Sequence, residues 1–202
     1  MTPDFIRDSL DALGKADPDI KKAVKLVGYP EPRNREPGFG ALLNIIIGQQ
    51  VSAQAAAAIR GRVIEAVDPF TPEVFLATDD EVLRAAGLSR RKVEYGNGLA
   101  EEFVTGRLDP DALTDASDDE IIKALTALRG IGRWSAEIYM LFALGRCDIW
   151  PAEDLAIQEA LRRLKDLEER PSRAASEPIV EPWRPLRGVA ALFLWHYYKG
   201  AP

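Results

Sequence analysis

The amino-acid sequence predicts an all-α protein, and three observations support this fold class. Apolar residues recur at spacings of three and four along most of the 202-residue chain, as in amphipathic helices. A capping residue followed by proline, as at Thr2-Pro3 and Asp17-Pro18, marks several helix starts. No convincing strand, fixed-period repeat or low-complexity segment interrupts this pattern. The result is about ten short helices joined by short loops.

The first third of the chain contains four of these helices. Two short ones run up to about Val27, and the proline-rich segment 28–38 then forms a connector. The helix expected from Phe39 to Gly48 is apolar nearly all round and should be buried. After a turn that begins at Gln49-Gln50, Ser52 caps an alanine-rich helix, whose small side chains allow close packing.

The middle third continues with short capped elements. One of them, starting at Ser89, carries a basic cluster in its first turn. Thr71-Pro72 and Asp79 are expected to open two short helices, the second of which ends at Gly87. Ser89 opens the helix that carries Arg90, Arg91 and Lys92, and Asp109-Pro110 opens a further short element.

Two glycines form a tight connection between the next two helices. Ser117 and Glu120 make a capping box at the start of the first helix, which we expect to end at Gly130. Gly130-Ile131-Gly132 is too tight for ordinary residues, and a second helix begins near Arg133. Free amides at a helix start beside glycines form a site for a phosphate. Such contacts read no base, so nucleic-acid backbone is the expected ligand.

An acidic loop then leads into another amphipathic helix. Trp150-Pro151-Ala152-Glu153-Asp154 places two carboxylates directly before that helix. Aspartate at this position is often only a helix cap. A helix start also stabilises a carboxylate charge, so a chemical role is compatible with capping. We expect the segment 168–185 to be a loop and 187–199 to form a final aromatic helix.

These motifs together resemble the helix-hairpin-helix DNA glycosylase superfamily, and within it the 3-methyladenine DNA glycosylase II subfamily. LRGIGRWSA is similar to the hairpin of that family and PAEDLAIQ to its catalytic loop. The stretches IIIGQQVSAQAA, LRAAGLSRRKVEY and WRPLRGVAALFLW also agree, so the resemblance covers roughly residues 35–200. It implies two helical lobes with a cleft for DNA and base, the first at about 40–145 and the second at 1–39 plus 150–202. Larger members add an N-terminal α/β domain, which this chain is too short to hold.

The resemblance implies roles for individual residues. Asp154 is the catalytic carboxylate, and Trp134, Ile138 and Trp195 line the base pocket. Ile138 stands where a relative has tyrosine, which makes the pocket less aromatic. Gln50, with Gln49 beside it, takes the place of the wedge that fills the gap left by a flipped base. By themselves these residues would be interpreted as core aromatics and a solvated turn.

The hairpin is implied to bind the DNA backbone through Gly130, Gly132, Arg133 and Ser135. In the resembled family, main-chain carbonyls hold a monovalent cation, Na⁺ or K⁺, and the matching positions are Thr126, Leu128 and Ile131. We expect no other cofactor. Cys147 is the only cysteine, which excludes a four-cysteine iron–sulfur cluster.

Composition limits the partners. The net charge of −6 argues against indiscriminate nucleic-acid binding, but local basic residues such as Arg129 and Arg133 can form a patch. No apolar run is long enough to span a membrane, and the acidic N-terminus is unlike a signal peptide. The expectation is a cytoplasmic monomer that binds damaged double-stranded DNA.

The sequence thus predicts a monofunctional glycosylase that excises alkylated, cationic bases such as 3-methyladenine. The lysine of strand-cutting relatives lies two residues after the second hairpin glycine, where this chain has Trp134. No lysine occurs between Lys123 and Lys165. The alternative is a non-catalytic helix-hairpin-helix DNA-binding module.

Overall fold

The computed structural model describes residues 1–201, and within them the protein consists of helices without strands. The predicted all-α class is therefore confirmed. The chain divides into two compact units, one made of Met1–Asn34 and Gly145–Pro202 and the other of Arg35–Leu144. The sequence had placed the corresponding limits near 39 and between 145 and 150. No described helix has the length and apolar character needed to cross a membrane.

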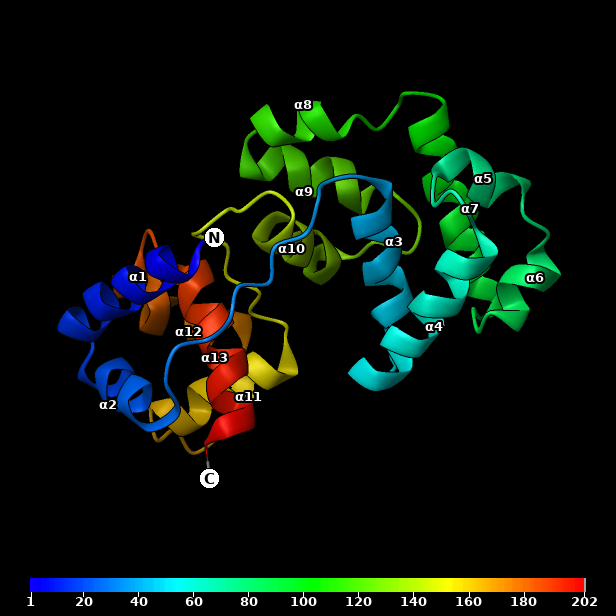
Figure 1. The fold of residues 1–202 in the computed structure, drawn as a ribbon. Coiled ribbons are helices and arrows are strands. Elements are labelled where there is room, and N and C mark those ends of the chain that lie inside the picture. The colour runs from blue at the N-terminus through cyan, green and yellow to red at the C-terminus, as the bar shows by residue number, and fades with distance from the viewer. Residues whose placement is uncertain (202) are drawn as a thin grey trace. The chain divides into compact units, whose positions relative to one another are not determined.

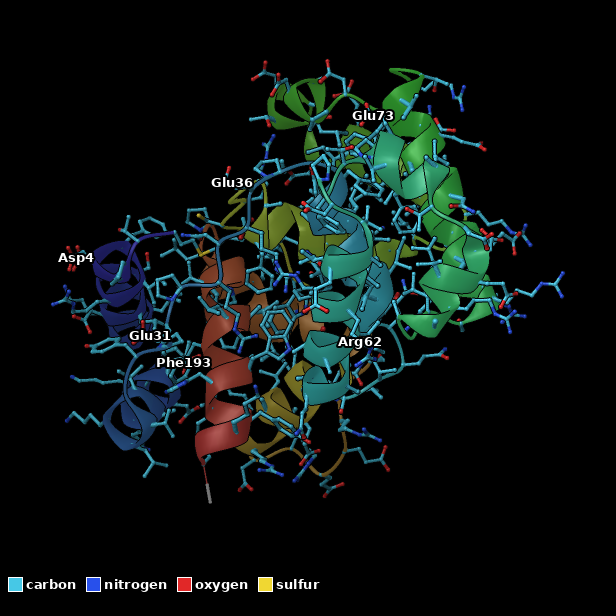
Figure 2. The ribbon with its side chains drawn as sticks, turned by 45° about the vertical axis from the view of Figure 1, so that its right-hand side comes forward. Asp4, Glu31, Glu36, Arg62, Glu73 and Phe193 are labelled. Atoms are coloured by element: carbon cyan, nitrogen blue, oxygen red, sulfur yellow. The ribbon has the colours of Figure 1, made fainter. Side chains whose placement is uncertain are left out.

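The first unit is built around its last helix. Every residue from Arg187 to Trp195 of that helix is buried, and Phe193, labelled in Figure 2, is 0% exposed. Figure 1 shows both ends of the chain contributing to this unit. Its elements are α1 (Pro3–Ala16), α2 (Pro18–Val27), α11 (Leu155–Leu164), α12 (Arg173–Val180), the 3₁₀ turn η1 (Glu181–Trp183) and α13 (Arg187–Gly200).

The second unit has two buried helices at its centre, α3 and α10, which pack against each other. A hydrogen bond links α10 to the end of the connector before α3: the Gly38 amide donates to the Tyr139 hydroxyl at 3.0 Å. The elements are α3 (Phe39–Gly48), α4 (Ala53–Ala66), α5 (Pro72–Ala77), α6 (Asp80–Ala85), α7 (Arg90–Val104), α8 (Pro110–Asp115), α9 (Asp118–Thr126) and α10 (Arg133–Phe142) (Figure 1).

Three sequence expectations were wrong in detail. The segment 168–185 contains a helix, because Ser172 caps α12 and buried Trp183 anchors the turn after it. Helix α9 ends at Thr126 rather than at Gly130, and a turn completes the connection. Of the side chains of α4 only Val63 is buried, so its alanines do not form the close packing surface we expected.

A buried ionic network holds together parts of the first unit that are distant in sequence. Asp17 is 8% exposed and caps α2. Its carboxylate accepts hydrogen bonds from the Trp183 indole at 2.8 Å and from Lys165 Nζ at 2.7 Å. A charged buried group with several donors stabilises a fold only while all partners remain.

We expect Asp17→Asn to destabilise the protein by about 2–3 kcal/mol, because the Lys165 ammonium loses the buried one of its two charged partners. Chemical denaturation measures this difference. Asp19→Asn is the matched control, since the Asp19 carboxylate also bonds Lys165, at 2.9 Å, but is more exposed. An equal loss in both variants would contradict the role of burial.

The same network predicts a pH dependence. Burial alone would raise the pKa of Asp17, but hydrogen bonds from Lys165 and Trp183 outweigh it and hold that pKa below its usual value of 3.8. Stabilisation by a group with a lowered folded pKa is complete above the unfolded pKa and is lost as the pH falls through the folded one. The stability difference between wild type and Asp17→Asn should therefore be constant near neutrality and shrink below about pH 4.

Candidate functional site

The hairpin between α9 and α10 depends on Gly130. Its φ of +90° lies in the left-handed region, which favours glycine. A Cβ at this position would also lie 2.3 Å from the ring of Tyr95 on α7. Backbone conformation and the close approach of an aromatic ring therefore both require glycine here.

Gly132 serves a different purpose. Its φ of −89° is accessible to any residue, and a Cβ there would meet no heavy atom within 4 Å. The expectation that the turn needs both glycines was wrong. Gly132 is the N-cap of α10 and has no capping side chain, so it leaves open space in front of the first amides of the helix. That space suits a phosphate oxygen.

The other two backbone-contact candidates are engaged within the protein. Arg133 Nε donates to Glu137 Oε1 at 3.0 Å, which offsets its charge, although half of the Arg133 side chain remains exposed. Ser135 is 3% exposed, and its hydroxyl accepts a hydrogen bond from Gln49. For contact with the DNA backbone, the main chain of Ser135 at the helix start is therefore a better candidate than its buried hydroxyl.

The Gln49-Gln50 turn contacts this hairpin directly. Gln49 Nε2 donates to the Gly130 carbonyl at 2.9 Å and to Ser135 Oγ at 3.2 Å. Gln50 is exposed and has a φ of +58°. The two glutamines therefore differ: the Gln49 side chain is bound within the protein, whereas Gln50, the residue matched to the wedge position, lies at the surface.

The turn and the hairpin line a common hollow of about 660 Å³, which we call the hairpin hollow. All three residues whose carbonyls were expected to hold a cation also line it. Its lining comprises Gln49, Gln50, Ser89, Arg91, Lys92, Tyr95, Thr126, Ala127, Leu128, Arg129, Gly130, Ile131 and Gly132.

The basic residues around the hairpin hollow are not equivalent. Arg129 forms an ion pair with Glu94, and Lys92 Nζ donates to two main-chain carbonyls. Arg90 and Arg91 are exposed in the first turn of α7, with no acidic residue beside them in that turn. A helix N-terminus disfavours cations, so these arginines gain little from their own helix and are suited to bind an anion from outside the protein.

In the first unit, Asp154 begins α11. Its Oδ1 accepts hydrogen bonds from the amides of Ala156 and Ile157 at 2.9 and 3.0 Å. The carboxylate is half-buried and fixed by two backbone donors at the positive end of a helix. Glu153 is exposed and faces Arg173 at 3.6 Å, so the two acids of the loop differ in environment.

Support for this loop comes from residues that the sequence did not identify. Asp148 accepts from Arg187 Nε at 2.9 Å and from Arg184 at 2.6 Å. The Trp150 indole donates to Ser176 Oγ at 3.0 Å. No local pattern predicts such pairs, because the partners are between 26 and 39 residues apart along the chain.

Trp195 offers an aromatic face for a cation. The guanidinium of Arg33 lies over its ring, 5.6 Å from the centroid. Partial burial lowers the pKa of Arg33, and the negative charge of Asp154 acts in the opposite direction. The proline-rich connector, for which the sequence predicts no regular structure, thus contributes Arg33 to the surroundings of Trp195.

The predicted pocket residues are divided between the two units. Asp154 and Trp195 belong to the first unit, and Trp134 and Ile138 to α10 of the second. Ile138 and Trp195 are each 8% exposed, and Trp134 is half-buried. By exposure alone, a core interpretation therefore suits Ile138 and Trp195 better than Trp134.

Known proteins are similar to this chain over most of its length. A family model described as an HhH-GPD superfamily base excision DNA repair protein matches residues 43–185. DNA-3-methyladenine glycosylase 1 of Schizosaccharomyces pombe is 35% identical over 195 residues, covering 93% of this chain and 85% of its own length. DNA-3-methyladenine glycosylase 2 of Escherichia coli is 27% identical, covering 88% of this chain and 65% of its own length.

Solved structures of 3-methyladenine DNA glycosylases are also similar to this chain. The Schizosaccharomyces pombe 3-methyladenine DNA glycosylase in complex with abasic DNA matches with a TM-score of 0.84 and 32% identity, over 93% of this chain and 95% of that one. A DNA-3-methyladenine glycosidase from Bacillus halodurans matches with a TM-score of 0.80 and 33% identity, over 93% and 87%.

The two glycines should respond differently to alanine. Gly130→Ala should lower the melting temperature, because it introduces strain at φ +90° and a clash with Tyr95. Gly132→Ala should fold normally yet weaken binding to damaged and undamaged duplex alike, because phosphate contacts carry no sequence information. Thermal melting and fluorescence anisotropy measure the two effects. A Gly132→Ala protein that lost only lesion binding would place the hairpin in base recognition instead.

Proposed function

The chain belongs to the HhH-GPD superfamily of base excision DNA repair proteins, and on that basis we propose that it is a DNA glycosylase for alkylated bases such as 3-methyladenine. The observation that carries this proposal is the Asp154 carboxylate, fixed by two backbone amides at the start of α11. In a non-catalytic DNA-binding module the same aspartate would serve only as the cap of α11. The relatives in the comparisons are named as glycosylases, which also favours the enzyme.

The chemistry follows from the charge of the sugar. As the bond between C1′ and the base nitrogen breaks, the sugar becomes oxocarbenium-like and positively charged. A fixed carboxylate stabilises that charge and orients the attacking water. The water oxygen bonds to C1′, its proton is lost to solvent or to the carboxylate, and the base leaves with the electron pair. A cationic alkylated base leaves as a neutral molecule and needs little acid assistance.

Aromatic faces suit such a base. Cations are attracted to tryptophan faces by about 0.5–2 kcal/mol. The guanidinium of Arg33 over Trp195 is consistent with a ring face that accepts a cation. We assign Trp195 and Trp134 to recognition of the base and Ile138 to its apolar wall. Because Ile138 replaces a tyrosine of a relative, the wall is less aromatic, and we propose that the substrates extend beyond 3-methyladenine.

Delivery of the base requires extrusion from the duplex. We assign Gln50 as the side chain that enters the stack, and Gly130, Gly132, Arg133 and Ser135 as the segment that meets the DNA backbone. The fit of a monovalent cation rests on the carbonyls of Thr126, Leu128 and Ile131, which lie at a helix C-terminus and its following turn. Carbonyls at a helix C-terminus are short of intrahelical donors, and the Leu128 carbonyl, which accepts from the Ile131 amide at 3.1 Å, keeps a second lone pair for a cation.

A methylated duplex tests the proposed function. The wild-type protein should release free 3-methyladenine and leave one abasic site per base released, scored by cleavage after heat or alkali. A panel of single-lesion duplexes would then define the range of substrates. Stable binding without release of any base would instead support the DNA-binding module.

The carboxylate is tested by Asp154→Asn. Asparagine keeps an oxygen that accepts from the Ala156 and Ile157 amides, so the cap and the fold should persist. Loss of the charge should lower single-turnover excision by at least about 100-fold, the usual scale for one electrostatic group, with DNA affinity retained. Glu153→Gln is the matched control. Excision near the wild-type rate in Asp154→Asn would remove the catalytic assignment.

We further propose that the enzyme does not cut the strand. Strand-cutting glycosylases form a Schiff base between a lysine amine and the sugar. Trp134 occupies the position of that lysine here, and the Arg133 guanidinium stays protonated and cannot replace it.

Borohydride should therefore trap no covalent protein–DNA adduct during turnover on an alkylated duplex. The abasic product should stay intact until heat or base is added. A bifunctional glycosylase run in parallel verifies the trapping conditions. An adduct with this protein would show that a lysine elsewhere in the fold acts as nucleophile.

A further inference from the structure

The turn that carries Gln50 has a backbone conformation that needs support. The φ of Gln50 is +58°, a region that few residues other than glycine adopt. Such a conformation persists where the surrounding structure over-determines it. Because Gln50 itself is exposed, the restraint must come from its neighbours.

Lys92 supplies the first restraint. From the first turn of α7, its Nζ donates to the carbonyls of Ile47 and Gln49, each at 2.8 Å. These carbonyls end α3, where orphan C=O groups carry partial negative charge and favour a cation. Lys92 is half-buried, and this burial lowers the pKa of its amine. The first turn of α7 is an unfavourable place for a cation, so the partner of Lys92 is the end of α3.

Gln49 supplies the second restraint. Its main-chain oxygen accepts a hydrogen bond from Lys92 Nζ, and its side-chain amide donates to the Gly130 carbonyl and to Ser135 Oγ. Gly130 is the glycine of the hairpin with a left-handed backbone, and Ser135 is a buried residue in the first turn of α10. The turn before α4 is therefore bonded to both α7 and the hairpin.

We propose that Lys92 and Gln49 are positioning residues that hold the turn in the conformation in which Gln50 can enter a base stack, before DNA binds. This inference rests on the proposed glycosylase function, because it assigns a purpose to the extrusion step. A preset turn avoids ordering a loop during binding. The bond from Gln49 to Gly130 also fixes the wedge relative to the segment that meets the backbone.

A merely structural role would have another signature. Loss of a stabilising bond would lower the melting temperature and reduce excision equally on all duplexes. Loss of wedge positioning should affect a normally paired lesion more than one opposite a stable abasic analogue. In the latter there is no pairing to break, so extrusion is easier.

Two variants remove the restraints without new charge, Lys92→Met and Gln49→Leu. Lys92→Arg is the conservative variant, because a guanidinium can reach two carbonyls. The matched control is Arg62→Met: Arg62, labelled in Figure 2, donates from Nε to the Ala86 carbonyl at 2.9 Å. Ala86 ends α6 in the same unit, so this control removes a cation from another helix end.

Single-turnover excision should fall about five- to tenfold on the paired lesion in Lys92→Met and Gln49→Leu, the scale of one net hydrogen bond. The lesion opposite the abasic analogue should be excised within about twofold of the wild-type rate. Lys92→Arg should recover most of the loss, and Arg62→Met should change stability without changing the ratio of the two rates. An unchanged ratio in both variants, or an equal change in Arg62→Met, would overturn the proposal.

A measurement of base unstacking, which does not depend on base excision, tests this proposal separately from the glycosylase function. With 2-aminopurine as the target base, unstacking on saturating protein raises the fluorescence, and the rise should be smaller in Lys92→Met and Gln49→Leu. If wild type raised fluorescence but released no alkylated base, the positioning role would stand and the function would fall. Full unstacking by both variants would remove the positioning role even with an active enzyme. Gln49→Leu carries the test alone if Lys92→Met does not fold.

Discussion

The bond between the Asp154 carboxylate and the start of α11 is the interaction on which the proposed chemistry depends. Two backbone amides hold one carboxylate oxygen, and the helix end stabilises its negative charge. An ordinary surface aspartate would rotate freely and be solvated, and would stabilise a sugar cation poorly. In the proposed chemistry, capping and catalysis are one arrangement, since the bonds that start the helix also preorganise the charge.

The remaining parts of the molecule serve to hold that carboxylate and to handle DNA. In the first unit, bonds from Arg187 to Asp148 and from Trp150 to Ser176 fix the loop before Asp154. In the second, one glycine makes the hairpin possible and another keeps its front open. The protein carries a net charge of −6, and exposed acids such as Asp4 and Glu73 (Figure 2) contribute to it. DNA contact must therefore be local, at exposed arginines such as Arg91.

Much of the fold could be predicted from sequence because its signals are local. Ser117 with Glu120 forms the expected capping box, and Ser52, Ser89 and Asp154 cap the helices they precede. The helix at Arg173–Val180 was missed because its polar, proline-containing sequence resembles a loop, and its stability comes from tertiary contacts of Trp183.

The site was predictable only in part, for the same physical reason. Resemblance identified the hairpin and Asp154, but local pattern could not show that Lys92 binds the end of α3, 43 to 45 residues away. From the sequence, this lysine beside two arginines is only one member of a basic cluster. Likewise, nothing in GQQ distinguishes Gln49 from Gln50, because the difference arises from the hairpin that folds against them.

The most direct test of the central claim is whether Asp154 stabilises positive charge at the sugar. Two duplexes differ only in an abasic analogue at one position, a cationic pyrrolidine or a neutral tetrahydrofuran. Wild-type protein should bind the cationic analogue at least about tenfold more tightly, which corresponds to 1.4 kcal/mol. Asp154→Asn should bind both equally. The same preference in both proteins would contradict the account, because the charge stabilisation would then come from elsewhere.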